Sequence, residues 1–247
     1  MVENARLHPM FSLLKLRPLV GELPEICPGQ FVQVQVPDSP GTFLRRPISV
    51  NDVDYERGLL WLLVRNAGEG TAHLLNLCED SVVNLLLPLG NPFAIPAAPS
   101  GKLLLVGGGV GVAPLLYLGK KMKEAGLAPE FLLGARSKDL LLELDLFKSV
   151  GPVHVATDDG SAGHHGLVTT HPVLDADVSH IYCCGPSPMM KGIAGVARRL
   201  GAECYVSLEN MMACGLGACL CCVEDTVKGN VCVCTEGPVF NINELKW

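Results

Sequence analysis

Hydrophobic and polar residues follow one pattern in the first part of the chain and another in the rest. In the first part, apolar residues form short runs that alternate with polar residues, as in FVQVQV (31–36). Proline and glycine separate these runs, for example in PDSPG (37–41) and NAGEG (66–70). Short, evenly spaced strands of this kind are typical of a small antiparallel barrel. We therefore expect a β-barrel domain over residues 1–98, followed by a linker at PAAPSG (96–101).

After this linker, apolar runs alternate with amphipathic segments that have the spacing of helices. Strands that alternate with helices are typical of a doubly wound α/β fold with a parallel sheet. We therefore expect an α/β domain over residues 101–206 and a cysteine-rich segment over residues 207–247. The expected strands are LLLVGG (103–108), EFLLGA (130–135), PVHVAT (152–157) and HIYCC (180–184), and the expected helices are APLLYLGKKMKEAG (113–126) and SPMMKGIAGVARRL (187–200).

Composition and charge exclude several classes of function. The formal net charge is −6, and no run of Lys or Arg is present, which argues against nucleic-acid binding. The longest apolar runs, LLWLLV (59–64) and VVNLLLPLG (82–90), are too short to cross a bilayer. The first residues lack the charged-then-apolar pattern of a secretory signal. We therefore expect a cytoplasmic protein with no nucleic-acid or membrane partner.

The chain contains eleven cysteines, and seven of them fall in one stretch near the carboxyl end. In a chain with no secretory pattern, such crowding favours cluster or metal ligation over disulfide bonds. Cys214, Cys219 and Cys222 have the C-x4-C-x2-C spacing that binds a plant-type [2Fe–2S] cluster. Gly215 and Gly217 lie between the first two of these cysteines. Residues without a Cβ allow the backbone to wrap tightly around a cluster.

Two cysteines compete for the fourth position of such a cluster. Cys232 and Cys234 alternate with valine, so they face the same way and geometry does not choose between them. Cys221 adds a further thiol. A structural zinc site is the alternative, but zinc sites usually join two short cysteine pairs, and the segment has one regular pair, Cys219 with Cys222. The broad visible absorption of a cluster would separate the two readings.

A glycine-rich turn, GGGVGVAP (107–114), directly follows the first expected strand of the α/β domain. Glycines at such a turn let phosphate oxygens approach backbone N–H groups at a positive helix end, which indicates nucleotide binding. Pro114 stands where the fingerprint has its third glycine. Arg136 follows the second strand, where an acidic residue would select NAD, so NAD and NADP both stay open.

Three further segments carry candidate ligand contacts. CGP (184–186) ends an expected strand, where open α/β sheets bind ligands, and Ser187 is the expected N-cap of the next helix. In the barrel, the Arg46 guanidinium can bridge phosphate oxygens, and Ser49 can meet the edge of a flavin ring. GEGT (68–71) precedes a helix-like segment and can offer backbone N–H groups to a pyrophosphate. Taken singly, each segment also fits a plain turn or a surface arginine pair.

A set of segments, taken together and in their order along the chain, resembles the ferredoxin-reductase superfamily: PGQF (28–31), Arg46-x-x-Ser49, GEGT (68–71), GGGVGVAP (107–114) and CGP (184–186). Within it, the chain resembles the electron-transfer subunits of the NAD-dependent (class 1B) dihydroorotate dehydrogenases. The residues that carry this narrower resemblance span nearly the whole chain: LRRPISV (44–50), PLGNPF (88–93), TDDGS (157–161), CGPSPMMK (184–191), SLEN (207–210), MACGLGACLCCVE (212–224) and CTEGPVF (234–240).

The resemblance implies FAD in the barrel, NAD(H) in the α/β domain and a [2Fe–2S] cluster in the C-terminal segment, and it assigns no catalytic residue. Many other reductases of this superfamily carry tyrosine where this chain has Ile48. The chain therefore lacks an aromatic ring that could stack on the flavin. Carried over residue by residue, the FAD contacts are Arg46, Pro47, Ile48, Ser49, Gly70 and Thr71, the nicotinamide cofactor lies around Gly109, Gly111, Cys184, Gly185 and Pro186, and the cluster ligands are Cys214, Cys219, Cys222 and Cys234, the last chosen by alignment on the EGPVF tail.

The resemblance also implies a function. Electrons pass from the FMN of a dihydroorotate dehydrogenase catalytic subunit through the cluster and FAD to NAD+, in de novo pyrimidine (UMP) biosynthesis. The chain carries no sign of a dihydroorotate site, so the catalytic subunit is the expected partner, in a heterotetramer with two copies of each. Glu209 and Asp158 stay open as contacts of the nicotinamide. The alternatives are the NAD(P)H reductase subunit of a hydrogenase, sulfide dehydrogenase or oxygenase, and a zinc-binding regulatory protein that binds nucleotides.

Overall fold

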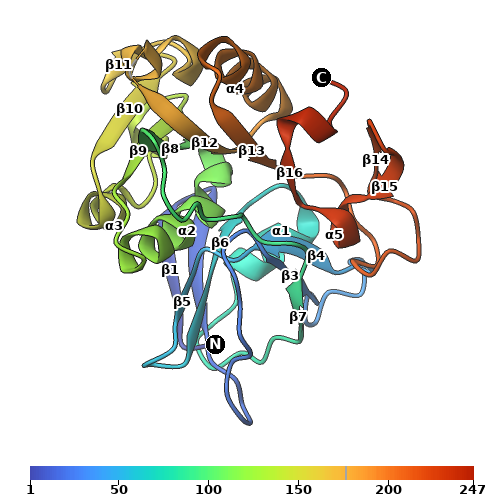
Figure 1. Ribbon diagram of the computed structural model, residues 1–247. Coiled ribbons are helices and arrows are strands. Elements are labelled where there is room, and N and C mark those ends of the chain that lie inside the picture. The colour runs from blue at the N-terminus through green and yellow to red at the C-terminus, as the bar shows by residue number, and fades with distance from the viewer. Residues whose placement is uncertain (176) are drawn as a thin grey trace.

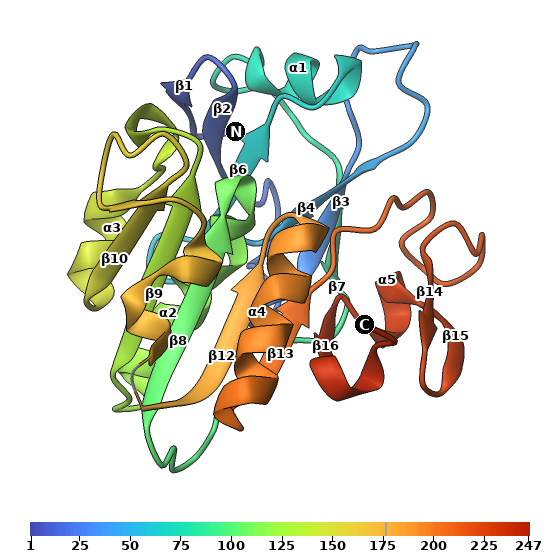
Figure 2. The ribbon, with the colours of Figure 1, turned by 90° about the horizontal axis from the view of Figure 1, so that it is seen from above.

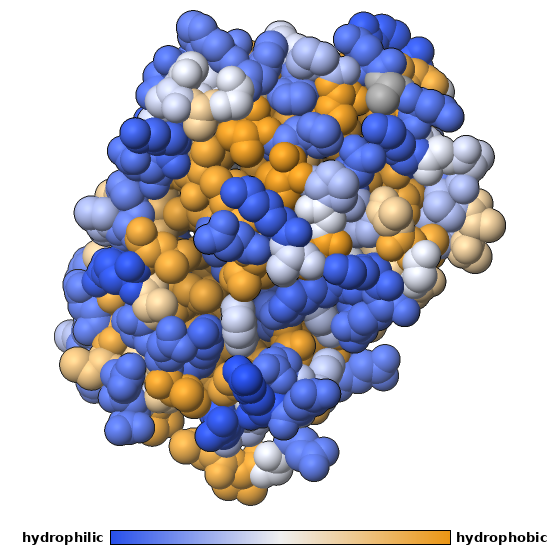
Figure 3. All heavy atoms as spheres, turned by 90° about the vertical axis from the view of Figure 1, so that its left-hand side faces the viewer, coloured by the Kyte–Doolittle hydropathy of each residue, from blue (hydrophilic) through white to orange (hydrophobic). Residues whose placement is uncertain are grey.

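The computed structural model describes residues 1–175 and 177–247. The N-terminal strands form the lower part of the molecule in Figure 1, the parallel sheet forms the upper part, and the C-terminal segment lies beside both. The face opposite this segment shows hydrophilic residues interspersed with apolar ones (Figure 3). Among the described residues, no helix combines the length and the apolar character that a membrane crossing requires.

The N-terminal part consists of two antiparallel sheets, as the short alternating runs predict. Their strand orders are β1-β2-β6-β5 and β4-β3-β7. Val32 and Val34 of β3 are buried in the apolar core between the sheets, together with Leu14, Leu62 and Leu74. The elements are β1 (Glu3–His8), β2 (Phe11–Leu16), β3 (Phe31–Val34), β4 (Arg46–Ser49), β5 (Asp52–Asp54), β6 (Leu59–Arg65), α1 (Glu69–Leu75) and β7 (Leu85–Leu89).

The central part is a doubly wound α/β fold, which confirms the expectation from the alternating pattern. Its sheet has the order β11-β10-β9-β8-β12-β13-β16. Helices α2 and α3 pack on one face of the sheet and α4 on the other. The elements are β8 (Lys102–Gly108), α2 (Ala113–Glu124), β9 (Pro129–Ala135), α3 (Leu144–Val150), β10 (Val153–Thr157), β11 (His164–His165), β12 (Val178–Cys184), α4 (Ser187–Leu200) and β13 (Glu203–Ser207), with short 3-10 turns η1 (Gly109–Val112), η2 (Lys138–Leu140), η3 (Val168–Thr170) and η4 (Pro172–Asp175).

The order of the central sheet determines where a ligand can bind. The chain leaves β8 toward β9 on one side and later returns to β12 on the other side of β8. The carboxyl ends of β8 and β12 therefore form the switch point at which doubly wound sheets bind ligands. The glycine-rich turn follows β8, and CGP (184–186) follows β12, so the fold brings these two motifs together.

The C-terminal segment is tied to both other parts of the molecule. Its strand β16 (Val239–Asn241) pairs antiparallel with β13 and so extends the central sheet, as Figure 2 shows. The side chain of Asn91, which follows β7, donates hydrogen bonds to the carbonyls of Thr235 and Glu236 at 3.1 and 2.8 Å. The remaining elements are the hairpin β14 (Val223–Thr226) and β15 (Gly229–Cys232), the short helix α5 (Val233–Glu236) and the turn η5 (Ile242–Glu244).

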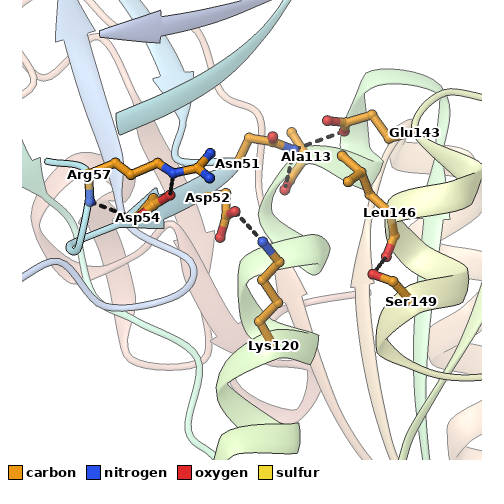
Figure 4. Close-up of polar contacts among 9 residues, drawn as sticks. All are labelled: Asn51, Asp52, Asp54, Arg57, Ala113, Lys120, Glu143, Leu146 and Ser149. Atoms are coloured by element: carbon orange, nitrogen blue, oxygen red, sulfur yellow. Dashed lines mark hydrogen bonds and ion pairs between the residues drawn. The ribbon is translucent and has the colours of Figure 1, made fainter. Parts of the chain in front are cut away.

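A buried polar cluster joins the barrel to the α/β part (Figure 4). Asn51 Nδ2 donates to the Ala113 carbonyl at 3.2 Å and to Glu143 Oε2 at 3.0 Å. Beside it, the Asp52 carboxylate pairs with Lys120 of α2. These contacts fix the start of α2, and with it the glycine-rich turn, against the barrel.

Candidate functional site

A pocket of about 320 Å³ opens where the three parts of the chain meet. The barrel contributes β4 and the end of β6, the α/β part contributes Val110 and Ala113 of the glycine-rich turn, and the C-terminal segment contributes residues 208–210 and Met212. Each of the three predicted binding segments therefore has residues at or beside one cavity. This convergence could not be read from the sequence, because the three segments are far apart along the chain.

All four residues predicted to contact FAD on β4 line this pocket: Arg46, Pro47, Ile48 and Ser49. Thr71, in the first turn of α1, lines it as well. Gly70 lies against the Arg46 side chain, because a Cβ at this position would be only 2.8 Å from Arg46 Nε. A guanidinium at the start of a helix suits a diphosphate. These residues therefore fit FAD, and Arg46 would hold its diphosphate.

The two predicted glycines of the nucleotide turn have different surroundings. Gly109 has a φ of 58° and open space where a Cβ would be. It gives a ligand close access to the backbone, at a φ that other residues rarely adopt. At Gly111, a Cβ would lie 2.5 Å from the Cys184 carbonyl oxygen. Gly111 therefore allows the turn to pack against the end of β12, and the turn as a whole fits a dinucleotide.

At the end of β12, Cys184 is fully buried, and its sulfur lies 3.8 Å from Glu209 Oε1. Burial raises the pKa of the Cys184 thiol well above its ordinary value and also raises the pKa of the Glu209 carboxyl. Glu209 lines both the main pocket and a second pocket of about 220 Å³, which Gly185 also lines. Pro186 precedes the first turn of α4. Glu209 thus joins the site, whereas Asp158 is exposed and lines neither pocket.

The loop that carries Cys214, Cys219 and Cys222, here called the cysteine loop, has the backbone conformation that its glycines predict. Gly215 and Gly217 have φ values of 74° and 77°, in the region that favours glycine. The Leu216 N–H points to Cys214 Sγ at 3.3 Å, and the Gly217 N–H points to Cys234 Sγ at 3.1 Å. Such N–H donors stabilise thiolates. The Leu216 N–H, followed by hydrogen bonds from Cys219, lowers the pKa of the Cys214 thiol to about 6.

The spacing of the thiols fits a two-iron cluster, because Cys214, Cys219 and Cys222 have the C-x4-C-x2-C pattern of a plant-type [2Fe–2S] site. In the part of the chain that the structure describes, no group of three or more Cys, His, Asp or Glu side chains is already placed to hold a metal ion. The Cys234 N–H also points to Cys222 Sγ at 3.4 Å. Cys221 is exposed and points to the Met211 carbonyl at 3.6 Å.

Two of the pocket residues have no motif that identifies them in the sequence. Leu63 and Arg65 line the cavity, although both belong to β6, which reads as an ordinary strand. Arg65 ends β6 just before the GEGT turn. Its proximity to a recognised motif is the one indication that the sequence offers.

Comparisons with known proteins identify the C-terminal segment and most of the chain. Residues 209–246 match the family model of the iron-sulfur cluster binding domain of dihydroorotate dehydrogenase B. The dihydroorotate dehydrogenase B (NAD(+)) electron transfer subunit of Shouchella clausii (strain KSM-K16) is 41% identical over 226 residues, covering 88% of this chain and 86% of that protein. The corresponding subunit of Bacillus caldolyticus is 40% identical over 225 residues, with the same coverage of 88% and 86%.

Solved structures share the fold. A chain of the NADH-dependent reduced ferredoxin-NADP oxidoreductase, studied for flavin-based electron bifurcation, has a TM-score of 0.87 and 32% identity and covers 100% of this chain and 88% of its own. The Amycolatopsis cytochrome P450 reductase GcoB has a TM-score of 0.69 and 25% identity, covering 80% of this chain and 64% of its own. On the identity and coverage of its relatives, this chain belongs to the family of dihydroorotate dehydrogenase B (NAD(+)) electron transfer subunits.

Proposed function

We propose that this chain passes electrons from the FMN of a dihydroorotate dehydrogenase catalytic subunit, through a [2Fe–2S] cluster and FAD, to NAD+ in pyrimidine biosynthesis. The observation that carries the proposal is the single pocket lined by the barrel, the nucleotide turn and the C-terminal segment. A cavity shared in this way can hold a flavin that is reached by a nicotinamide from one part and by a cluster from another.

Each of the three parts is proposed to bind one cofactor: residues 1–98 bind FAD, residues 101–206 bind NAD and residues 207–247 bind the cluster. When bound, FAD exchanges a hydride with a nicotinamide and single electrons with an iron–sulfur cluster. The chain itself supplies binding and position. Arg46 would neutralise diphosphate charge, and Gly109 leaves space for a dinucleotide. The apolar walls of the pocket, including Phe31 and Ile48, would exclude water from a flavin ring.

The partner is proposed to dock on the cysteine-rich segment. Five large apolar side chains are exposed there: Met211, Leu216, Leu220, Val223 and Val227. Exposed apolar residues often belong to protein interfaces, and these five lie next to the cysteines along the chain. A catalytic subunit bound at this surface would place its FMN near the cluster. We propose a heterotetramer with two copies of each subunit, in the cytoplasm.

The test is to purify the chain anaerobically, both alone and together with an FMN-containing dihydroorotate dehydrogenase catalytic subunit. Alone, the chain is expected to contain FAD, iron and sulfide and to oxidise NADH with ferricyanide. Together, the two subunits are expected to reduce NAD+ with dihydroorotate. Cys214→Ser removes a ligand, so it is expected to lower this second rate at least a hundredfold and to leave NADH oxidation by ferricyanide in place.

Cys78→Ser is the matched control, because Cys78 is an exposed thiol of the barrel, outside the cysteine loop. It is expected to behave as wild type in both assays. Dihydroorotate-dependent NAD+ reduction at the wild-type rate in Cys214→Ser would contradict the proposal. Failure of the paired subunits to oxidise dihydroorotate, with NADH oxidation intact, would instead favour a reductase subunit of another redox complex.

A further inference from the structure

Gln33 is a buried polar residue whose side-chain amide has no hydrogen-bond partner among the described residues. It lies on β3 and is completely buried. Neither Nε2 nor Oε1 of its carboxamide has a hydrogen-bond partner among the described residues. An unpartnered buried polar group is destabilising, so nearly all buried polar groups in folded proteins have a hydrogen-bond partner. The carboxamide of Gln33 therefore indicates a missing hydrogen-bond acceptor, donor or both.

The strand face that carries Gln33 also forms a wall of the flavin pocket. Phe31 lies two residues earlier on the same face, and Pro47 and Ser49 of β4 lie directly opposite Gln33 and Phe31. Phe31, Pro47 and Ser49 all line the pocket. Directly opposite side chains in an antiparallel pair have Cβ atoms about 4.5–5.5 Å apart. Gln33 therefore stands at the edge of the pocket wall, next to Pro47.

The other side of Gln33 is covered by the cysteine loop. A Cβ at Gly215 would lie 2.7 Å from Gln33 Cγ and 2.9 Å from Nε2, so the two residues are in direct contact. Gly215 directly follows Cys214, the first expected cluster ligand. The backbone of Gln33 is fixed as well, because Arg45 Nη1 donates to its carbonyl at 3.3 Å and to that of Asn84 at 3.0 Å. A rigid strand thus holds an amide between the pocket and the loop.

We propose that the Gln33 carboxamide donates a hydrogen bond to a sulfur of the bound [2Fe–2S] cluster and raises its reduction potential. This inference rests on the cluster of the proposed function. The amide nitrogen is the polar atom of Gln33 nearest to the loop, and thiolate or sulfide sulfurs are the acceptors that the loaded loop would bring to it. Hydrogen bonds to the sulfurs stabilise the more negative, reduced cluster and so favour its reduction. Gln33 acts here as a positioning residue.

The test compares Gln33→Met with Gln35→Met in the purified chain. Methionine has nearly the length of glutamine but no N–H donor. Gln35, two residues further along, is exposed and serves as the matched control. The readouts are iron and sulfide content, the electron paramagnetic resonance spectrum of the dithionite-reduced chain, and the midpoint potential measured against redox dyes.

Gln33→Met is expected to bind iron as wild type does. Its equilibrium constant for one-electron reduction of the cluster is expected to fall about tenfold, which is a midpoint potential about 59 mV more negative. The g values of its electron paramagnetic resonance spectrum are expected to change. Gln35→Met is expected to match wild type. Gln33→Glu, which keeps the length and polarity, guards against a methionine variant that fails to fold, and its negative charge is expected to lower the potential further. If the Gln33 variants bind the cluster and have the same midpoint potential as wild type, the inference is wrong. If the wild-type chain itself contains no iron, the proposed cluster is wrong.

Discussion

At the scale of single residues, Cys234 and Cys232 differ in their surroundings, and this difference predicts which of them binds iron. The Cys234 sulfur is buried and accepts the Gly217 N–H at 3.1 Å. The Cys232 sulfur lies 3.9 Å from the Gly217 carbonyl oxygen, which cannot stabilise a thiolate. We therefore expect Cys234→Ser to lose most of its iron and Cys232→Ser to keep it.

The measurement for this pair is iron, sulfide and FAD per chain after anaerobic purification. FAD content checks that the barrel has folded, because the flavin pocket does not include either cysteine. Loss of iron in Cys232→Ser, with iron retained in Cys234→Ser, would move the fourth ligand to Cys232.

Residues with a special spacing or backbone were predictable, whereas residues with long-range partners were not. Gly215 and Gly217 were predicted from their place between two cysteines, and both have positive φ. Gln33 was not predicted, because alternation in FVQVQV describes a strand with one exposed face. The C-terminal segment covers that face, so Phe31 and Gln33 are both buried. The sequence around β3 does not indicate that a distant segment packs on this face of the strand.

At the scale of elements, the junction of the glycine-rich turn with β12 has no room for a side chain. A Cβ at Gly111 would lie 2.5 Å from the Cys184 carbonyl oxygen and 2.6 Å from the Gly185 Cα. These are backbone atoms and cannot rotate away. We expect Gly111→Ala to lower the free energy of unfolding by about 1–3 kcal/mol and to weaken NADH binding, measured by urea unfolding and NADH titration.

Gly195→Ala in α4 is the matched control for Gly111→Ala. Its Cβ would meet nothing within 4 Å, and alanine is favoured over glycine in a helix by about 0.5–1 kcal/mol. We expect this variant to be slightly more stable than wild type, with unchanged NADH binding. Equal stability of the two alanine variants would contradict the packing role of Gly111.

The two helices and four parallel strands that the sequence predicts lie within a few residues of the expected positions, because their apolar periods are long and regular. Helix α3 and strand β13 were not predicted. The helix expected at 187–200 is observed at those residues. The predicted N-cap, Ser187, was wrong by one position. Pro186 has a non-helical ψ of 138°, and its carbonyl accepts the Met190 N–H at 3.1 Å, so Ser187 already belongs to the helix. The expected strand at 31–36 ends earlier, at Val34.

At the scale of the whole molecule, the parts were predictable but their contacts were not. Period and composition separate a β part, an α/β part and a cysteine-rich part. The strand β16, which joins the last part to the central sheet, is three residues long and carries no pattern of its own. The polar cluster between barrel and α/β part depends on Asn51 and Glu143, which are far apart in the chain. Contacts of this kind follow from packing rather than from local sequence.

This polar cluster has a consequence for the pH dependence of stability. Glu143 precedes α3 and accepts a hydrogen bond from Asn51 of the barrel, as Figure 4 shows. Burial raises the pKa of its carboxyl to about 7. The charge of Asp52 raises this pKa further, whereas the Asn51 hydrogen bond and the charges of Lys120 and Lys15 lower it. The folded protein therefore holds a proton at Glu143 at pH values where the unfolded chain has lost it.

The sign of the effect follows from this proton. Between about pH 4.5, the ordinary pKa, and about pH 7, the folded state binds more protons, so stability falls as pH rises, by up to about 3 kcal/mol. Glu143→Gln stays neutral, so its stability relative to wild type is expected to increase across this window, measured by urea unfolding from pH 4.5 to 8.5. Asp145→Asn, at an exposed position of α3, is the control and should leave the slope unchanged. A pH-independent difference between Glu143→Gln and wild type would show that the carboxyl titrates normally and that burial between the two parts does not raise its pKa.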